Sequence, residues 1–120
     1  MPMPVDNALA SVAVKDLKAA TQWYERLLRR KASTPMPEIA EWQFARGGGL
    51  QVYDGVPERA GKCSCTLAVS DFEEVVAHVK SLGIDTREQS SNASVKTLMI
   101  KDPDGNSIAF AQAADKRLAR

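Results

Sequence analysis

The sequence predicts an α+β fold built from two similar βαβββ modules, and two observations carry this prediction. Short apolar runs typical of strands alternate with two amphipathic helical patterns along the 120 residues. The pattern also repeats, since a shift of 55 residues places Ala13-Val14-Lys15-Asp16-Leu17 over Ala68-Val69-Ser70-Asp71-Phe72. One module carries a single helix on one sheet face, so pairing two modules covers apolar surface that one alone leaves exposed.

The first module is expected over residues 8–54. Its helix begins after Asp16, a good N-cap, and its apolar positions recur at the i, i+3 and i+4 spacing. The helix is expected to end in Arg29-Arg30-Lys31, because cations suit the negative end of a helix dipole. Pro35 and Pro37 restrict the next segment to an edge strand or loop. The expected strands are residues 8–14, 33–37, 41–46 and 50–53, with a triple-glycine turn at 47–49.

A linker containing glycine and proline, residues 55–62, separates the two modules of what is expected to be a single domain. Asp71 and Glu74 have the spacing of a capping box, and Gly83 marks the end of the second helix. The second module covers residues 63–112, with expected strands at 63–69, 84–88, 95–101 and 107–112 and a polar turn at 89–93. Residues 113–120 form a basic tail with no predicted structure.

The last two strands are joined by Asp102-Pro103-Asp104-Gly105-Asn106, which has turn chemistry at nearly every position. Proline fixes φ near −65°, glycine and asparagine tolerate positive φ, and aspartate side chains bond nearby backbone N–H groups. The segment therefore predicts a β-hairpin near the end of the second module.

Composition excludes several functional classes. The chain is 44% hydrophobic and 26% charged with a net charge of +1, so no strong field directs it to nucleic acid or to an anionic membrane. No apolar run is long enough for a transmembrane helix, and the first residues lack the pattern of a signal peptide. Two cysteines without such a signal favour free thiols in a reducing compartment. We therefore expect a cytoplasmic protein with no nucleic-acid or membrane partner.

The repeat and three local motifs resemble the vicinal oxygen chelate superfamily, which includes glyoxalase I, extradiol dioxygenases and bleomycin-resistance binding proteins. The motifs are Val14-Lys15-Asp16-Leu17, Trp23-Tyr24-Glu25 and Asp102-Pro103-Asp104-Gly105-Asn106-Ser107-Ile108. The resemblance covers roughly residues 8–112. It implies two modules forming an incomplete β-barrel around a cleft, with the helices on the outer face, usually within a homodimer. Members range from metalloenzymes to pure binding proteins, so the fold does not decide the function.

The resemblance also implies where a metal would bind. The metal-ligand positions of the superfamily correspond here to Leu9, Gln51, Ser64 and Ala109. Imidazole and carboxylate are the groups such sites need, and none of these residues has either. We therefore expect no metal and no cofactor.

The remaining metal-binding residue types have a structural interpretation. The single histidine, His78, lies beside the apolar stripe of the second helix, where a packing or surface role is expected. Cys63 and Cys65 alternate with Ser64, so both thiols are expected on the helix-packed face of their strand if Ser64 faces the cleft.

The same alternation predicts a cleft lined by small and hydroxyl-bearing side chains, which leave volume for a ligand. Trp42 and Tyr53 are expected to stack on a planar ligand ring, and Glu38 or Glu41 to pair with a cationic one. An alternative is that Trp42, Phe44, Met99 and Tyr53 fill the cleft as core. The candidate ligand-binding residues are Leu9, Ser11, Trp42, Gln51, Tyr53, Ser64, Thr66 and Ala109.

The preferred prediction is a homodimeric small-molecule-binding protein without a metal, possessing no catalytic residues and acting by enclosing its ligand, as in drug sequestration. The alternative is a glyoxalase- or dioxygenase-like lyase or oxidoreductase with non-standard site residues. A third hypothesis is a metal-free lyase or isomerase with a carboxylate base such as Glu38, Glu41 or Asp54, but these form no carboxylate pair at a useful spacing.

Overall fold

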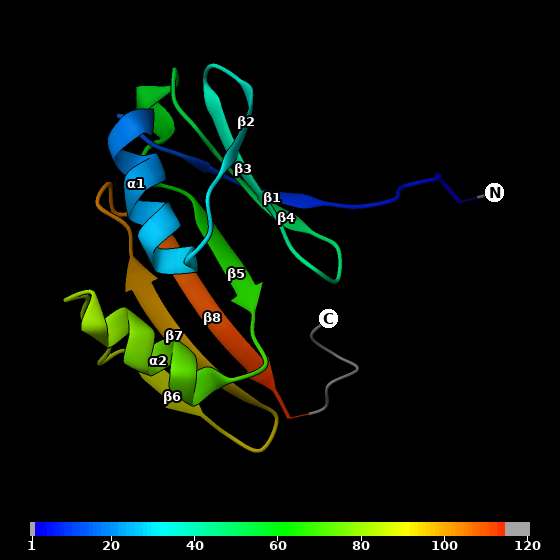
Figure 1. Ribbon diagram of the computed structural model, residues 1–120. Coiled ribbons are helices and arrows are strands. Elements are labelled where there is room, and N and C mark those ends of the chain that lie inside the picture. The colour runs from blue at the N-terminus through cyan, green and yellow to red at the C-terminus, as the bar shows by residue number, and fades with distance from the viewer. Residues whose placement is uncertain (1, 115–120) are drawn as a thin grey trace.

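The computed structural model of the chain describes residues 2–114 (Figure 1). Most of the expected basic tail, residues 115–120, lies outside this range. In chain order the elements are β1 (Leu9–Ala13), α1 (Leu17–Leu28), β2 (Ser33–Met36), β3 (Ile39–Gln43), β4 (Gly49–Tyr53), a short 3₁₀ helix (Pro57–Arg59), β5 (Ser64–Ala68), α2 (Phe72–Ser81), β6 (Gln89–Ser91), β7 (Val95–Lys101) and β8 (Ser107–Ala113).

The strands form two four-stranded mixed sheets, with the orders β1-β4-β3-β2 and β5-β8-β7-β6. In each sheet the first strand of the module pairs in parallel with the last, and the other neighbours are antiparallel. Neither sheet of the described chain closes into a barrel. The predicted α+β class and the two βαβββ modules are confirmed.

Both helices begin at the predicted aspartates. The Asp16 carboxylate accepts a hydrogen bond from the Ala19 N–H at 3.2 Å, and the Asp71 carboxylate accepts one from the Glu74 N–H at the same distance. These bonds satisfy N–H groups that have no partner inside the helix. The Glu74 side chain instead pairs with Arg29, which follows the last residue of α1, so only one half of the expected capping box is seen among the described contacts.

The third strand of the second module does not lie where the sequence predicted it. Residues 84–88 are not a strand, and β6 occupies part of the segment expected to be a turn. The Asp85 carboxylate accepts a hydrogen bond from the Arg87 N–H at 2.9 Å and also pairs with the Arg87 guanidinium at 2.8 Å, which stabilises a local turn. Apolar spacing over so short a segment could not reveal this side-chain turn.

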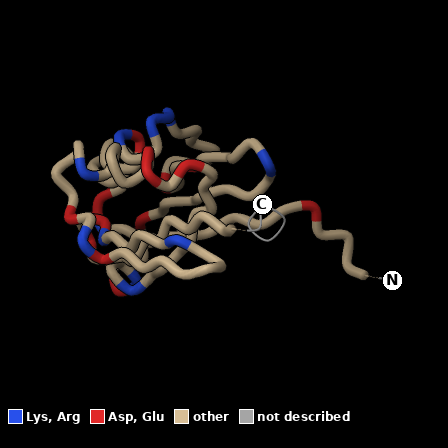
Figure 2. The backbone as a smooth tube through the Cα atoms, turned by 90° about the horizontal axis from the view of Figure 1, so that it is seen from below, with Lys and Arg blue, Asp and Glu red and all other residues tan. Residues whose placement is uncertain are grey.

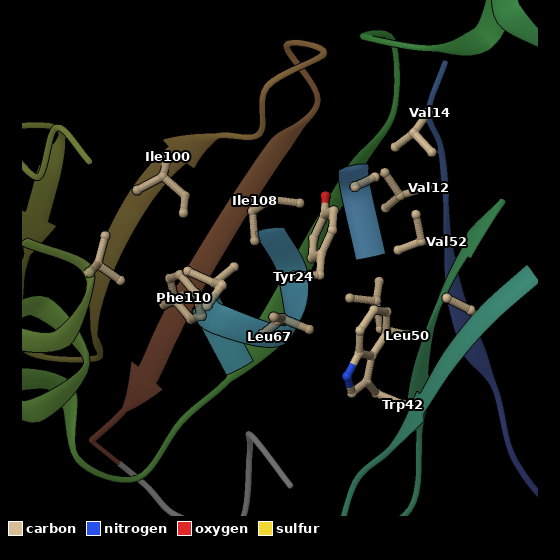
Figure 3. Close-up of a cluster of buried hydrophobic side chains, with 14 of the residues drawn as sticks. Val12, Val14, Tyr24, Trp42, Leu50, Val52, Leu67, Ile100, Ile108 and Phe110 are labelled. Carbon is tan, nitrogen blue, oxygen red and sulfur yellow. The ribbon is translucent and has the colours of Figure 1, made fainter. Parts of the chain in front are cut away.

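The core is shared between the two modules. Figure 3 shows side chains of both sheets converging on Tyr24 of α1, with Val12 and Leu50 on one side and Ile108 and Phe110 on the other. All five side chains are at most 5% exposed. The helix-facing rows of the two sheets therefore belong to one hydrophobic core, and the opposite rows point away from it.

A buried polar network joins the end of the second module to the first. The Asn106 Nδ2 donates to the Ala13 carbonyl and to the Asp102 carboxylate, both at 2.8 Å, while its Oδ1 accepts from the Gly61 and Cys63 N–H groups. The Tyr24 hydroxyl donates to the same carboxylate at 2.7 Å. Asp102 and Asn106 are 4% and 0% exposed, so each of these groups depends on its protein partners.

Charge is spread over the molecule. Lys and Arg are interspersed with Asp and Glu along the backbone in Figure 2, with no large region of a single sign in that view. No helix in residues 2–114 has the length and apolar character needed to cross a membrane.

Candidate ligand-binding site

In the first module, four of the five predicted site residues lie on the sheet face that points away from the core, and Trp42 is the exception. Leu9 and Ser11 of β1 stand beside Gly49 and Gln51 of β4 in parallel register. The Ser11 hydroxyl donates a hydrogen bond to Gln51 Oε1 at 3.1 Å. Gln51 is paired on its other side with Glu41 of β3, so a continuous polar row crosses three strands.

Tyr53 belongs to the same face, two residues beyond Gln51, and its side chain is half-buried. Hydrogen bonding to Tyr53 is the main cause that raises the pKa of Arg59, which follows in the 3₁₀ helix. Reasoning from the sequence missed Arg59, because this residue lies in a linker that has no periodic pattern. Its guanidinium adds a positive charge beside the aromatic ring that was expected to stack on a ligand.

In the second module, Ser64 and Thr66 of β5 stand beside Ser107 and Ala109 of β8. Ser107 also pairs with Lys101 of β7, whose ammonium group donates to the Ser107 hydroxyl at 2.9 Å. This face thus carries a second polar row, one that ends in a cation where the first row ends in the Glu41 carboxylate. The sequence could have revealed Lys101, because it lies two residues after Met99 and side chains at that spacing share one face of a strand.

Trp42 does not lie on this surface, and the expectation that it stacks on a ligand is wrong. Its side chain is 1% exposed, its ring centroid is 6.0 Å from that of Tyr24, and its indole N–H donates to the Arg30 carbonyl at 2.9 Å. The cause is strand register, because Trp42 pairs with Leu50 on the helix-facing side while Glu41 pairs with Gln51. The glycine-rich turn allows several hairpin registers, so the sequence could not decide between them.

The alternative that Trp42, Phe44, Met99 and Tyr53 together fill the cleft as core is wrong as well. Trp42 and Phe44 belong to the core side, whereas Tyr53 and Met99 are on the opposite face, so the four side chains do not form one cluster. The Arg30 guanidinium lies 5.8 Å from the Phe44 ring centroid, a cation–π contact at the edge of the core.

The four positions that carry metal ligands in relatives do not fit a metal here. Leu9 and Ala109 have no donor atom, the Ser64 hydroxyl is a poor ligand, and Gln51 Oε1 already accepts the Ser11 hydrogen bond. Within residues 2–114, no group of three or more His, Cys, Asp or Glu side chains is placed to hold a metal ion. The residues at this face therefore do not form a metal site of the kind that the resemblance implies.

The other possible ligands have structural roles. The His78 Nε2 lies 2.9 Å from the Arg26 carbonyl and 3.1 Å from the Leu27 carbonyl, so it connects α2 to the last turn of α1. Cys63 and Cys65 are half-buried, free and packed against the core, as predicted. Burial is the largest cause that raises the pKa of the Cys65 thiol to about 11.

Comparison with known proteins defines the family. Neither the protein-family models nor the curated protein sequences give a match. Among solved structures, a glyoxalase/bleomycin resistance protein from Catenulispora acidiphila DSM 44928 is 34% identical, with a TM-score of 0.79 over 90% of this chain and 98% of its own. The chain belongs to the glyoxalase/bleomycin resistance family of the vicinal oxygen chelate superfamily.

More distant structures share the fold. TnmS3, an antibiotic binding protein from Streptomyces sp. CB03234, is 21% identical with a TM-score of 0.81 over 94% of this chain and 100% of its own. The oxidase ChaP-H2 is 18% identical with a TM-score of 0.75 over 92% of this chain and 94% of its own. One fold therefore carries both a binding protein and an enzyme, and the residues of the site must decide between them.

Proposed function

We propose that this protein is a cytoplasmic small-molecule-binding protein that encloses its ligand without a bound metal. The observation that carries the proposal is the chemistry of the two sheet faces. They carry hydroxyls, an amide, the Tyr53 ring and one charged group in each row, which suit binding, and the four metal-ligand positions of the family hold neither imidazole nor carboxylate.

We further propose that a second copy of the chain completes the site. The two polar rows alternate with the residues of the shared core along their strands, so within one chain they point away from a common interior. A cleft between them forms when the first module of one copy faces the second module of another. Each cleft then joins the row Ser11–Gln51–Glu41 of one copy to the row Ser64–Ser107–Lys101 of its partner.

The proposed ligand is a planar or cationic compound. Tyr53 offers an aromatic face for stacking, and the Glu41 carboxylate, held by the Gln43 amide at 3.3 Å, offers a partner for a cation. TnmS3 is an antibiotic binding protein of the same fold, which supports antibiotic sequestration as the biological role.

The competing hypothesis is a glyoxalase- or dioxygenase-like enzyme with displaced site residues. The oxidase ChaP-H2 supports it at the level of the fold. Glu41 is the one carboxylate within the two polar rows described above, and it has no second carboxylate opposite it in register. Acid–base catalysis by a pair of carboxylates therefore lacks its second member at this face, so we favour binding.

Calorimetric titration with metal-free bleomycin tests the ligand class. We expect saturable binding to the wild type and a loss of roughly tenfold in Glu41→Gln, because the charge that pairs with the ligand is removed. Glu73→Gln is the matched control, since Glu73 is an exposed carboxylate on α2 and its removal leaves the site unchanged. Equal affinity of the wild type and Glu41→Gln for bleomycin would contradict the proposal of a cationic ligand. Chemical turnover of bleomycin would favour the competing hypothesis of an enzyme.

A mixing experiment tests whether two copies share each site. Ser11→Trp blocks the face of the first module and Thr66→Trp blocks that of the second, so neither variant alone should bind. If each cleft combines modules of different copies, a mixed dimer regains one intact cleft, and binding returns when the variants are refolded together. Binding that stays absent in the mixture, with mixed dimers present by native mass spectrometry, would place both faces of a site in one chain.

A further inference from the structure

We propose that the groove between α1 and α2 is a second small-molecule site, which takes a compact apolar molecule carrying one carboxylate. The groove is open to solvent and offers about 260 Å³, a little below the usual range for ligand sites of roughly 300–1,000 Å³. It lies on the helix side of the second sheet, whereas the proposed ligand face lies on the opposite side, so the two sites are independent.

The floor and walls of the groove are apolar. Leu27, Val79 and Phe110 form part of the buried core beneath it, and Leu28 and Val75 are partly buried along its sides. The helices meet where His78 of α2 contacts the last turn of α1, and apolar surface stays uncovered beside that contact. A hydrocarbon chain or ring in this groove would remove that surface from water, which is the main favourable contribution to binding of an apolar group.

Arg29 gives the groove its polar end, and its backbone is strained. It follows the last residue of α1 with φ of 54° and ψ of 39°, the one non-glycine residue with positive φ in residues 2–114. The helix of the second module is followed instead by Gly83 with φ of 77°, the residue type that adopts this conformation without cost. A strained arginine at a cavity is a reason to look for a function of its side chain.

The guanidinium of Arg29 crosses the mouth of the groove to Glu74 of α2 at 3.3 Å. Both side chains are more than half exposed, so this ion pair is weak and a ligand can replace it. Arg29 is the arginine among the side chains that line this groove, and a ligand carboxylate can take two hydrogen bonds from its guanidinium in place of the single contact with Glu74.

The test uses octanoate as the probe and the methyl signals of Leu27, Val75 and Val79 in a carbon–proton NMR spectrum as the readout. We expect saturable shifts of these methyl groups, with a dissociation constant in the millimolar range. Octanol, which has the same chain without the charge, should bind about tenfold more weakly.

Two variants assign the effect to the ion pair. Arg29→Gly keeps the helix end, since glycine suits its backbone, and should weaken octanoate about tenfold, while Glu74→Gln removes the competing carboxylate and should strengthen it. Arg46→Ala, an exposed arginine in the turn of the first module, is the control and should change nothing. Absence of saturable methyl shifts, equal affinity for octanol, or an unchanged affinity in Arg29→Gly would each overturn the proposal.

Discussion

The two modules end in hairpins that occupy matching places in the repeat but have different roles. The turn at residues 102–106 in the second module buries a carboxylate and an amide and bonds to α1 and β1 of the first. The turn at residues 45–48 in the first module contains two glycines and is largely exposed, and one described side-chain contact to it comes from Asn7, which accepts from the Gly48 N–H. Repetition of a module therefore does not repeat its function. One hairpin holds the modules together, and the other faces solvent beside the proposed ligand surface.

Loss of the buried amide should show the largest difference between the hairpins. Asn106→Ala leaves the Gly61 N–H, the Cys63 N–H and the Ala13 carbonyl without partners in the interior, and we expect the free energy of unfolding to fall by about 3–5 kcal/mol. Asn7→Ala, the matched change at the other hairpin, should cost less than about 1 kcal/mol because water replaces the lost bonds. Urea unfolding of both variants measures the two values, and similar losses would remove the distinction between the hairpins.

The close approach of the linker to the second hairpin should give the next largest effect. A Cβ at Gly61 would lie 2.5 Å from the Asp104 carbonyl oxygen, and φ there is +86°, so Gly61→Ala should cost about 2–4 kcal/mol. Gly47 in the first hairpin has φ of +91°, but its nearest contact would be 3.7 Å away. Gly47→Ala should therefore cost only about 1 kcal/mol, for the backbone conformation alone. Equal costs in thermal unfolding would show that the linker can move away from the hairpin.

The bond from α1 to the second hairpin makes a smaller contribution that depends on pH. Tyr24→Phe removes a hydrogen bond to a buried carboxylate and should cost about 2 kcal/mol at neutral pH, against less than about 0.5 kcal/mol for Tyr53→Phe. Burial, with the bond to Asp102, raises the pKa of Tyr24 well above its ordinary value of 10.0. The folded protein therefore holds this proton more tightly than the unfolded chain, and wild-type stability should decrease as the pH rises above 10.0.

The control for this pH effect is the phenylalanine variant itself. Tyr24→Phe has no proton to lose at that position, so its unfolding free energy should show less dependence on pH in the alkaline range. Parallel curves for wild type and variant would mean that Tyr24 ionises as easily in the folded protein as in the unfolded chain.

The smallest effect concerns reactivity rather than stability. The pKa of Cys65 is raised to about 11, so at pH 8 about one thiol in a thousand is ionised. In Cys63→Ser, where Cys65 is the remaining thiol, labelling by a disulfide reagent should be at least tenfold slower than that of free cysteine, and should accelerate toward pH 11. Labelling as fast as that of free cysteine would show that the second module opens readily where it packs against the first, so that the Cys65 thiol becomes exposed to solvent.

The sequence by itself determined the modules, their helices and one face of each sheet. Periods of two and 3.6 residues report which side of an element is apolar, so the inward and outward rows of β1, β5 and β8 followed from alternation. The aspartate caps and the 102–106 turn were readable because their chemistry acts within a few residues of the chain.

Only the tertiary structure decided what lies far apart in sequence. The position of Trp42 depended on a hairpin register that three glycines leave open, and β6 depended on a local Asp85–Arg87 turn with no apolar signal. The groove between the helices arises from the relative placement of α1 and α2. The role of Asn106 likewise arises from packing, because its partner Ala13 is in the other module and hydrogen bonds across such a distance leave no periodic pattern in a sequence.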